Sequence, residues 1–216
     1  MISIIICSIN QEKFSAITKN YTDLMGDEPF EIIGIHDAQS LCEGYNRGIQ
    51  KSVGDILIFS HDDIEILSPD FVTKLKVHLE NFDLVGLAGT DWVIDGSWVS
   101  AGFPYLYGQV ADCDEDVYAI SFYDFGETAY QGKTTEDGIK MLDGLFFAVR
   151  RSVVQQVLFD ENNFDGFHCY DADFSYSAFR AGFSLAVCND IAVIHYSNSP
   201  FAVSYTHLTL PTSDLV

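Results

Sequence analysis

Basic residues are scarce in this chain of 216 residues. Only 11 lysines and arginines stand against 32 aspartates and glutamates, which gives a formal net charge of −21. Binding to the phosphate backbone of a nucleic acid needs clustered Lys and Arg, so this composition argues against a nucleic-acid partner. It also disfavours electrostatic docking on an anionic membrane. An anionic ligand would need a metal ion between itself and a protein this acidic.

Long apolar runs and a secretion signal are also missing. No stretch reaches the length of a membrane-spanning helix, so we expect no integral membrane segment. No basic region precedes the apolar residues Ile2–Cys7, so no signal peptide is expected. Five cysteines lie scattered without a C-x-x-C pair, which excludes a zinc ribbon and favours reduced thiols. We therefore expect a cytoplasmic protein.

Three common nucleotide-binding and hydrolase motifs are absent. The absence of a G-x-G-x-x-G motif excludes the dinucleotide oxidoreductases. The absence of a G-x-S-x-G motif excludes the usual nucleophile of α/β-hydrolases. Gly132-Lys133-Thr134 is similar to the end of a phosphate-binding loop, but Glu127 stands where that loop requires glycine. The segment Ser8-Ile9-Asn10-Gln11 lacks the glycines and basic residues that a sugar nucleotidyltransferase would place after its first strand.

Apolar segments alternate with amphipathic ones through the first half of the chain. This alternation predicts an α/β fold with a mainly parallel central sheet flanked by helices on both faces. Ser68 is expected to cap the third helix, with Pro69 at its first position. The expected strands are Ile2–Cys7, Glu31–His36, Asp55–Ser60 and Asp83–Ala88, and the expected helices are Glu12–Met25, Leu41–Lys51 and one that carries the stripe Phe71, Leu75 and Leu79.

The middle of the chain, residues 89–141, is rich in Gly, Tyr, Trp and Phe in short alternating runs. We expect a small antiparallel insert there, with strands at Trp98-Val99-Ser100 and Val117–Tyr123. Aromatic side chains suit the apolar face of a sugar ring, and a flap that only packs on the core is an equal alternative. The later elements are expected at Leu145–Val149, Ser152–Val157, Asp173–Ala181 with Gly182 at C′, Ser184–Cys188 and Ile191–His195.

The last residues differ in kind from the rest. Val203–Thr212 resembles the translation of a transposase-type sequencing adapter. We therefore expect residues 1–202 to form the domain and residues 203–216 to be a non-native tail, with the natural reading frame lost near Ala202. His207 is accordingly excluded as a candidate ligand.

Polar side chains gather where the expected strands end. Asp37 follows the second strand, and His61-Asp62-Asp63 follows the third. Ligands of α/β sheets bind beyond the carboxyl ends of the strands, where adjacent acids can hold a divalent cation. A solvated acidic turn is the alternative for an isolated His-Asp-Asp. Further polar groups along the chain are Asn46-Arg47-Gly48, Asp143-Gly144, Phe167–Asp173 and His195.

In this order and spacing, these motifs resemble the family 2-type glycosyltransferases of the GT-A (nucleotide-diphospho-sugar transferase) fold. The resemblance is to the glycosyltransferase-like family 2 branch that is associated with a streptomycin-biosynthesis StrF-type domain. It covers Ile2 to Ser199 and rests on Ser3–Asn10, Gly44–Gly48, Gly54–Asp63, Asp143–Val149, Phe167–Gly182 and His195-Tyr196-Ser197. It implies a hexosyltransferase-like enzyme that transfers a sugar from a nucleotide-diphosphate donor to an acceptor hydroxyl with inversion. Residues 89–141 would then be the acceptor-side insert.

The resemblance implies a role for each matching position. Asp63 would bind Mn²⁺ or Mg²⁺, with His61 in place of the first acid of the Asp-x-Asp signature and His195 as a late ligand. Asp171 would be the base that deprotonates the acceptor hydroxyl, with Asp173 as the second candidate. The implied nucleotide-binding positions are Ser8, Asn10, Asp37, Asn46 and Asp62.

The chemistry of sugar transfer asks for the same groups. A divalent metal would stabilise the negative charge that grows on a departing diphosphate, and the acceptor hydroxyl needs a carboxylate base on the opposite face. Asp171 and Asp173 flank the expected helix N-terminus, whose dipole favours an ionised carboxylate by about 0.3–1 kcal/mol. We therefore expect the base to be kept ionised, with plain helix capping as the alternative.

Two positions depart from the family pattern. His61 replaces an acid, and its imidazole suits Mn²⁺ better than Mg²⁺. Tyr170 stands where the family motif more commonly has Glu. His195 is as readily a structural histidine as a ligand. These points support a rival interpretation, a non-catalytic nucleotide-sugar-binding or scaffold module on the same fold. The acceptor stays open between a surface polysaccharide, a small metabolite and a lipid-linked sugar, and the last would bring the chain to the inner face of the membrane.

Overall fold

The computed structural model describes residues 1–114, 119–124 and 132–196. Its central sheet is built from β1 (Ile2–Cys7), β2 (Phe30–Ile35), β3 (Ile56–Ser60), β5 (Leu84–Gly86), β9 (Thr135–Ile139), β11 (Phe146–Arg150) and β12 (Leu185–Cys188). The seven strands lie in the order β2-β1-β3-β11-β5-β12-β9. All run in one direction except β11 and β9. The prediction of a mainly parallel central sheet is confirmed.

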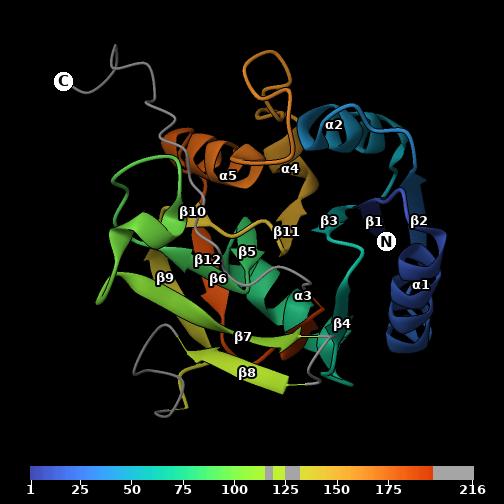
Figure 1. Ribbon diagram of the computed structural model, residues 1–216, viewed down its shortest axis with the longest axis horizontal. Helices are drawn as coiled ribbons and strands as arrows, with labels where there is room; N and C mark the ends of the chain where they lie inside the picture. The colour runs from blue at the N-terminus through green and yellow to red at the C-terminus, as the bar shows by residue number, and fades with distance from the viewer. Residues whose placement is uncertain (115–118, 125–131, 197–216) are drawn as a thin grey trace.

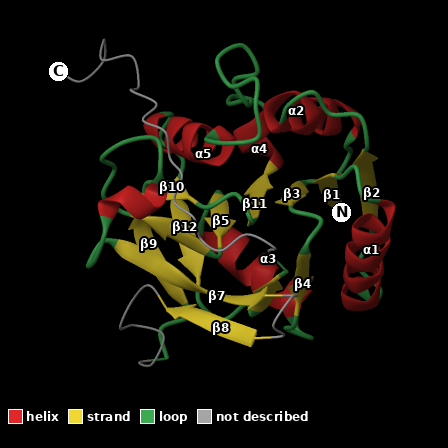
Figure 2. Cartoon of the chain, viewed as in Figure 1, coloured by secondary structure: helices red, strands yellow, loops and turns green. Residues whose placement is uncertain are grey.

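Helices cover both faces of this sheet (Figure 2). They are α1 (Gln11–Met25), α2 (Leu41–Lys51), α3 (Phe71–Asn81), α4 (Arg151–Val154) and α5 (Tyr170–Arg180). Successive side chains of a strand point to opposite faces, so Ile4 of β1 packs in the cluster formed with α1 and α3, and Ile5 packs in the cluster formed with α2, α4 and α5. Figure 1 shows α2, α4 and α5 along one side of the sheet. Each fully buried aliphatic or aromatic side chain stabilises the fold by about 1.5–3 kcal/mol.

A second sheet lies beside the first. Its strands are β4 (Ile64–Ile66), β6 (Ala88–Thr90), β7 (Leu106–Asp114), β8 (Ala119–Asp124), β10 (Met141–Leu142) and β13 (Val193–His195). They lie in the order β10-β6-β7-β13-β4, with β8 on β7. The pairs β10–β6, β6–β7 and β7–β8 are antiparallel, as expected for the insert. The insert is continuous with the late strand β13, which pairs with β7 and β4.

Two strand predictions in this region were wrong. The expected strand Asp83–Ala88 is two strands, β5 and β6, which belong to different sheets. The expected strand at Trp98-Val99-Ser100 is a short 3₁₀ helix, η1 (Trp98–Ala101). The expected strand Val117–Tyr123 is described only from residue 119 on, where it belongs to β8. The expected tail, residues 203–216, lies outside the described residues.

Two helix boundaries also differ from expectation. Helix α3 begins at Phe71, and Ser68 does not cap it, because the Ser68 hydroxyl accepts the Ala192 N–H at 2.9 Å. Helix α5 begins three residues earlier than expected, at Tyr170. Its end at Gly182 is confirmed: this residue has φ +92° and donates to the Phe179 carbonyl at 2.9 Å, in a Schellman-type turn. No helix in the described part of the chain is long and apolar enough to span a bilayer.

Asn46 ties α2 to the loop that precedes α5. Its side-chain amide donates to the Phe159 carbonyl at 2.8 Å and accepts the Phe159 N–H at 3.1 Å. Both residues are buried, so the Phe159 N–H depends on Asn46 for its hydrogen bond, whereas the Phe159 carbonyl also accepts the Glu161 N–H at 3.0 Å.

We predict that Asn46→Ala lowers the free energy of unfolding by about 1–3 kcal/mol, because the buried Phe159 N–H loses its partner and the Phe159 carbonyl loses one of two donors. Urea denaturation measures this loss. Asn81→Ala is the matched control: Asn81 is exposed and donates only to Val77 of its own helix, so the change should stay within about 0.5 kcal/mol. Equal losses in the two variants would contradict the tying role of Asn46.

Candidate active site

The candidate site lies at the carboxyl edge of the central sheet. Strands β1, β2 and β3 are parallel neighbours, so the residues that follow them emerge at the same edge. Strand β11 runs against β3, and the loop before it returns to this edge. The His61 N–H donates to the Leu145 carbonyl at 3.0 Å, which joins the two loops.

Three potential metal ligands meet at this edge. The ligand atoms of His61, Asp63 and His195 all lie within 4.8 Å of one another. Asp63 Oδ1 is 3.5 Å from His195 Nε2 and 3.8 Å from His61 Nδ1. His195 reaches Asp63 because β13 pairs with β4, in which Ile64 is the direct partner of His195. Two imidazoles and a carboxylate fit a divalent transition metal such as Mn²⁺ better than Mg²⁺, which prefers oxygen ligands.

The electrostatic surroundings favour the protonation states that a metal requires. Burial raises the pKa of the Asp63 carboxyl, but the hydrogen bond from His195 and the charges of His61, His195 and Lys13 lower it well below its usual range. The Lys13 Nζ lies 3.2 Å from Asp63 Oδ2. Burial lowers the pKa of His61 against the opposing pull of Asp63. An ionised carboxylate beside a neutral imidazole is the state in which both groups can coordinate a metal.

Three of the expected nucleotide-binding residues lie together at the end of β1. The Ser8 hydroxyl donates to Asp62 Oδ2 and accepts the Asn10 N–H at 3.2 Å. Asn10 caps α1, since its side chain accepts the N–H groups of Glu12 and Lys13 at 2.9 and 3.1 Å. This cap also directs Lys13 toward the site.

The other two expected nucleotide-binding residues have different partners. Asp37 is exposed, and its Oδ1 lies 2.9 Å from Arg47 Nη2. The hydrogen bond from Arg47, together with its charge, lowers the pKa of Asp37. Asn46 is committed to Phe159, as described above. The structure therefore brings together Ser8, Asn10 and Asp62 but does not join Asp37 or Asn46 to them through these contacts.

His61, Asp63 and His195 are called the metal-type cluster below, and His61 is the member of it that lines a cavity of about 130 Å³ at the start of α5. Both His61 and Asp171 line it, as do Trp98 and Asp143, whereas Asp173 does not. Burial and, after it, the Asp143 charge raise the pKa of Asp171 while backbone N–H groups lower it, and the net result is a pKa of about 7. The expected effect of the helix N-terminus, which favours the ionised carboxylate, is outweighed by burial and Asp143. A carboxyl whose pKa lies near neutrality is suited to act as a general base.

Asp173 is also perturbed, but for a different reason. Burial and, after it, the charge of Asp160 together raise its pKa to about 6. Because Asp173 stands outside the cavity lining, Asp171 is the better placed of the two candidate bases.

Four residues of this site had no role assigned from the sequence: Lys13, Trp98, Asp143 and Tyr170. The Trp98 indole N–H donates to Asp143 Oδ2 at 2.7 Å, and the Leu145 N–H donates to Asp143 Oδ1 at 2.9 Å. The Tyr170 hydroxyl lies 2.8 Å from His61 Nε2. Lys13 follows the Asn10 cap by three residues, which is the only sequence signal that could have placed it at the strand end.

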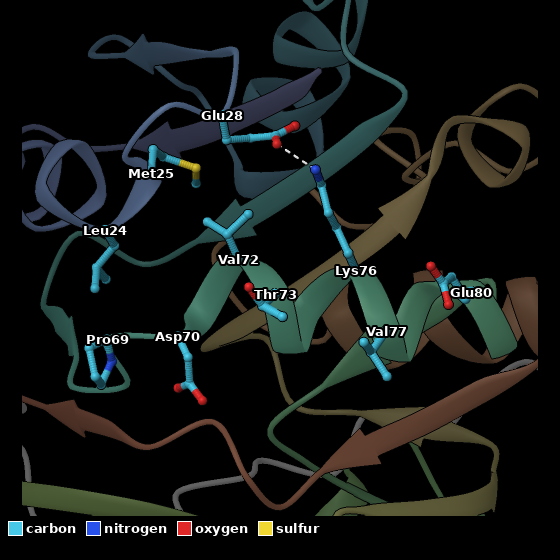
Figure 3. Close-up of a pocket in the computed structure, with 10 residues that line it drawn as sticks. All are labelled: Leu24, Met25, Glu28, Pro69, Asp70, Val72, Thr73, Lys76, Val77 and Glu80. Carbon is cyan, nitrogen blue, oxygen red and sulfur yellow. Dashed lines mark hydrogen bonds and ion pairs between the residues drawn. The ribbon is translucent and has the colours of Figure 1, made fainter.

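The larger hollow of the molecule lies elsewhere, between α1 and α3 (Figure 3). It has a volume of about 450 Å³ and is lined by apolar residues mixed with charged ones. The Lys76 ammonium pairs with Glu28 across it. None of the candidate site residues lines this hollow, so we place the function at the smaller cavity.

The chain belongs to a family of glycosyltransferase-like proteins, whose family model matches residues 3–207. The fold is the GT-A fold of glycosyltransferases. The match overlaps the first residues of the expected tail, whose boundary near Ala202 stays a prediction. No curated protein matches this sequence.

Solved structures of glycosyltransferases share the fold at low sequence identity. TarS 1-349 from S. aureus, in complex with UDP-GlcNAc, has a TM-score of 0.61 at 9% identity, over 96% of this chain and 62% of that one. The mannosyltransferase PcManGT from Pyrobaculum calidifontis, in complex with GDP-Man and Mn²⁺, has a TM-score of 0.54 at 10% identity, over 94% of this chain and 58% of that one. GalNAc-T7 with UDP, GalNAc and Mn²⁺ has a TM-score of 0.56 at 13% identity, over 91% of this chain and 44% of that one. This chain thus spans about half of the length of these three relatives.

We predict that Asp143→Asn lowers the pKa of Asp171 below about 7, since it removes a negative neighbour but keeps an oxygen for the Trp98 indole. A ¹³C NMR titration of the aspartate carboxyl groups measures this change. Asp160→Asn is the control, because Asp160 acts on Asp173 and should leave Asp171 unchanged. An unaltered Asp171 titration in Asp143→Asn would disprove the coupling.

Proposed function

We propose that this chain transfers a sugar from a nucleotide-diphosphate donor to an acceptor hydroxyl, with a divalent metal and with inversion at the sugar carbon. The observation that carries the proposal is the shared cavity. His61, one of the three potential metal ligands, lines the same cavity as Asp171, whose carboxyl has a pKa of about 7. Mn²⁺ is the ion that two imidazoles and a carboxylate suit, and two of the structural relatives are solved with Mn²⁺.

Each group has a distinct role in this proposal. His61, Asp63 and His195 hold the metal, which when bound supplies positive charge to the diphosphate. Ser8, Asn10 and Asp62 orient the nucleotide beside α1, with Asp37 and Asn46 retained as more distant candidates. Lys13 provides a second positive charge, now paired with Asp63, that the diphosphate can attract.

Asp171 performs the proton step. Its ionised carboxylate takes the proton of the acceptor hydroxyl as the acceptor oxygen forms its bond to the sugar carbon. The bond from that carbon to the diphosphate oxygen breaks, and the nucleoside diphosphate leaves with the electron pair. Attack from the face opposite the leaving group inverts the carbon, and it requires Asp171 to lie on the face of the sugar opposite the diphosphate.

The StrF-type branch, a hexosyl donor, a cytoplasmic location and a role in polysaccharide synthesis belong to the same proposal. The cytoplasmic location rests on the five scattered cysteines, and the other three points rest on the sequence resemblance. A non-catalytic nucleotide-sugar-binding module is the competing function, and the two variants below separate it from an enzyme.

We predict that Asp63→Ala abolishes metal-dependent nucleotide binding. The melting temperature of the wild-type chain should rise with one of UDP, GDP, CMP or dTDP only when Mn²⁺ is present, because a ligand of the native state stabilises it. The Asp63→Ala chain should show no such rise, whereas the exposed control Asp27→Ala should match the wild type. A metal-dependent rise that survives in Asp63→Ala would place the metal elsewhere.

We predict that Asp171→Asn retains donor binding but lowers the transfer rate by about 10²-fold or more, as expected for loss of a general base. In the wild-type chain the rate should increase with pH through about pH 7, because only the ionised Asp171 accepts the proton. Steady-state kinetics with the donor found above measures both effects. Full activity in Asp171→Asn would reject the base, and donor binding without any transfer by the wild type would favour the non-catalytic module.

A further inference from the structure

The hydroxyl of Tyr170 lies between two hydrogen-bonding groups. It is 2.8 Å from His61 Nε2 and 3.0 Å from the carbonyl oxygen of Gly144. A carbonyl oxygen can only accept, so the single hydroxyl proton of Tyr170 is donated to Gly144. The Tyr170 oxygen must then accept, and the hydrogen of a neutral His61 ring must sit on Nε2.

This arrangement leaves the lone pair of His61 on Nδ1. That atom faces Asp63 Oδ1 at 3.8 Å, and the same carboxylate oxygen is 3.5 Å from His195 Nε2. A histidine coordinates a metal through the ring nitrogen that carries no hydrogen, and the hydrogen bond made by the other nitrogen decides which one that is.

Packing fixes the position of the Tyr170 hydroxyl. The side chain is 4% exposed, and its ring centroid lies 5.6 Å from that of Tyr45 and 6.4 Å from that of Phe159. A Cβ at position 144 would lie 2.1 Å from the Tyr170 oxygen, so only glycine allows this approach to the backbone. The hydroxyl is therefore held at one place by the aromatic cluster below it and by the bare backbone beside it.

We propose that Tyr170 is a positioning residue that holds His61 in the Nε2–H tautomer, so that His61 Nδ1 is directed at the metal. The proposal rests on the metal role given to His61 under the proposed function. Tyr170 is the residue before Asp171, so the first turn of α5 supplies both the base and the support of a metal ligand.

The tautomer is tested first, in the metal-free wild-type chain. Long-range ¹H–¹⁵N correlation spectra distinguish Nε2–H from Nδ1–H imidazoles, and the His61 signals are assigned by their loss in His61→Gln. We expect the Nε2–H form for His61. Observation of the Nδ1–H form would overturn the proposal, whatever the chain proves to catalyse.

The second test is Mn²⁺ affinity, measured from the free-ion EPR signal during a titration without nucleotide. Tyr170→Phe keeps the ring in the aromatic cluster and removes only the oxygen. We expect its Mn²⁺ dissociation constant to rise by about 10- to 100-fold, the range found when the partner of a ligating histidine is removed. Circular dichroism and the melting temperature report whether the variant is folded.

Tyr107→Phe is the matched control. Its hydroxyl donates to Asp91 Oδ2 at 3.0 Å, so the variant also loses one tyrosine hydrogen bond, but from a residue outside the metal-type cluster. We expect wild-type Mn²⁺ affinity. Equal affinity in folded Tyr170→Phe and wild type would overturn the positioning role, whereas absence of Mn²⁺ binding by the wild type would overturn the metal site on which it rests.

Discussion

The site depends on one constraint, the parallel pairing of β1 with a neighbour on each side. Ile2 is the partner of Phe30 in β2 and of Ile56 in β3, so the three strands keep one register and end at nearly the same level. A strand that is covered by helices on both faces can hold few polar side chains. Polar residues therefore follow the strands instead, and the register brings those that follow β1 and β3 into hydrogen-bonding contact, as Ser8 and Asp62 show.

The surroundings of each acid at this edge determine its protonation state. Asp63 has two imidazoles and the Lys13 ammonium within 4 Å, so its charge is stabilised. Asp171 is desolvated near a second carboxyl, Asp143, so its charge is destabilised and its pKa rises to about 7. Two carboxyl groups whose pKa values are moved in opposite directions can serve as an ionised ligand and a proton acceptor in one site. In a protein with a net charge of −21, these two aspartates thus differ in pKa because Lys13 and the two imidazoles lie beside only one of them.

Much of the fold and part of the site could be predicted from the sequence. Apolar runs located the buried strands, and glycine at position 182 located the end of α5, because these signals are local. The division of residues 83–90 between two sheets could not be predicted. Both β5 and β6 are buried along their whole length, so this segment has one continuous apolar pattern in the sequence. The contact between His61 and Tyr170 spans 109 positions, and that between Trp98 and Asp143 spans 45. Such contacts follow from strand order and helix placement, which the periodicity of a single segment does not contain.

The two departures from the family pattern are in direct contact. His61 and Tyr170 replace acids of the expected motifs, and their side chains are 2.8 Å apart. A carboxylate at position 170 would add a negative charge next to Asp171, and like charges raise a carboxyl pKa. The tyrosine hydroxyl adds no charge, yet it still accepts the His61 hydrogen. Histidine at position 61 in turn gives this hydroxyl a donor that an acid, ionised, would not provide. His61 and Tyr170 therefore hydrogen-bond to each other without placing a negative charge at either position, and each supplies the partner that the other needs.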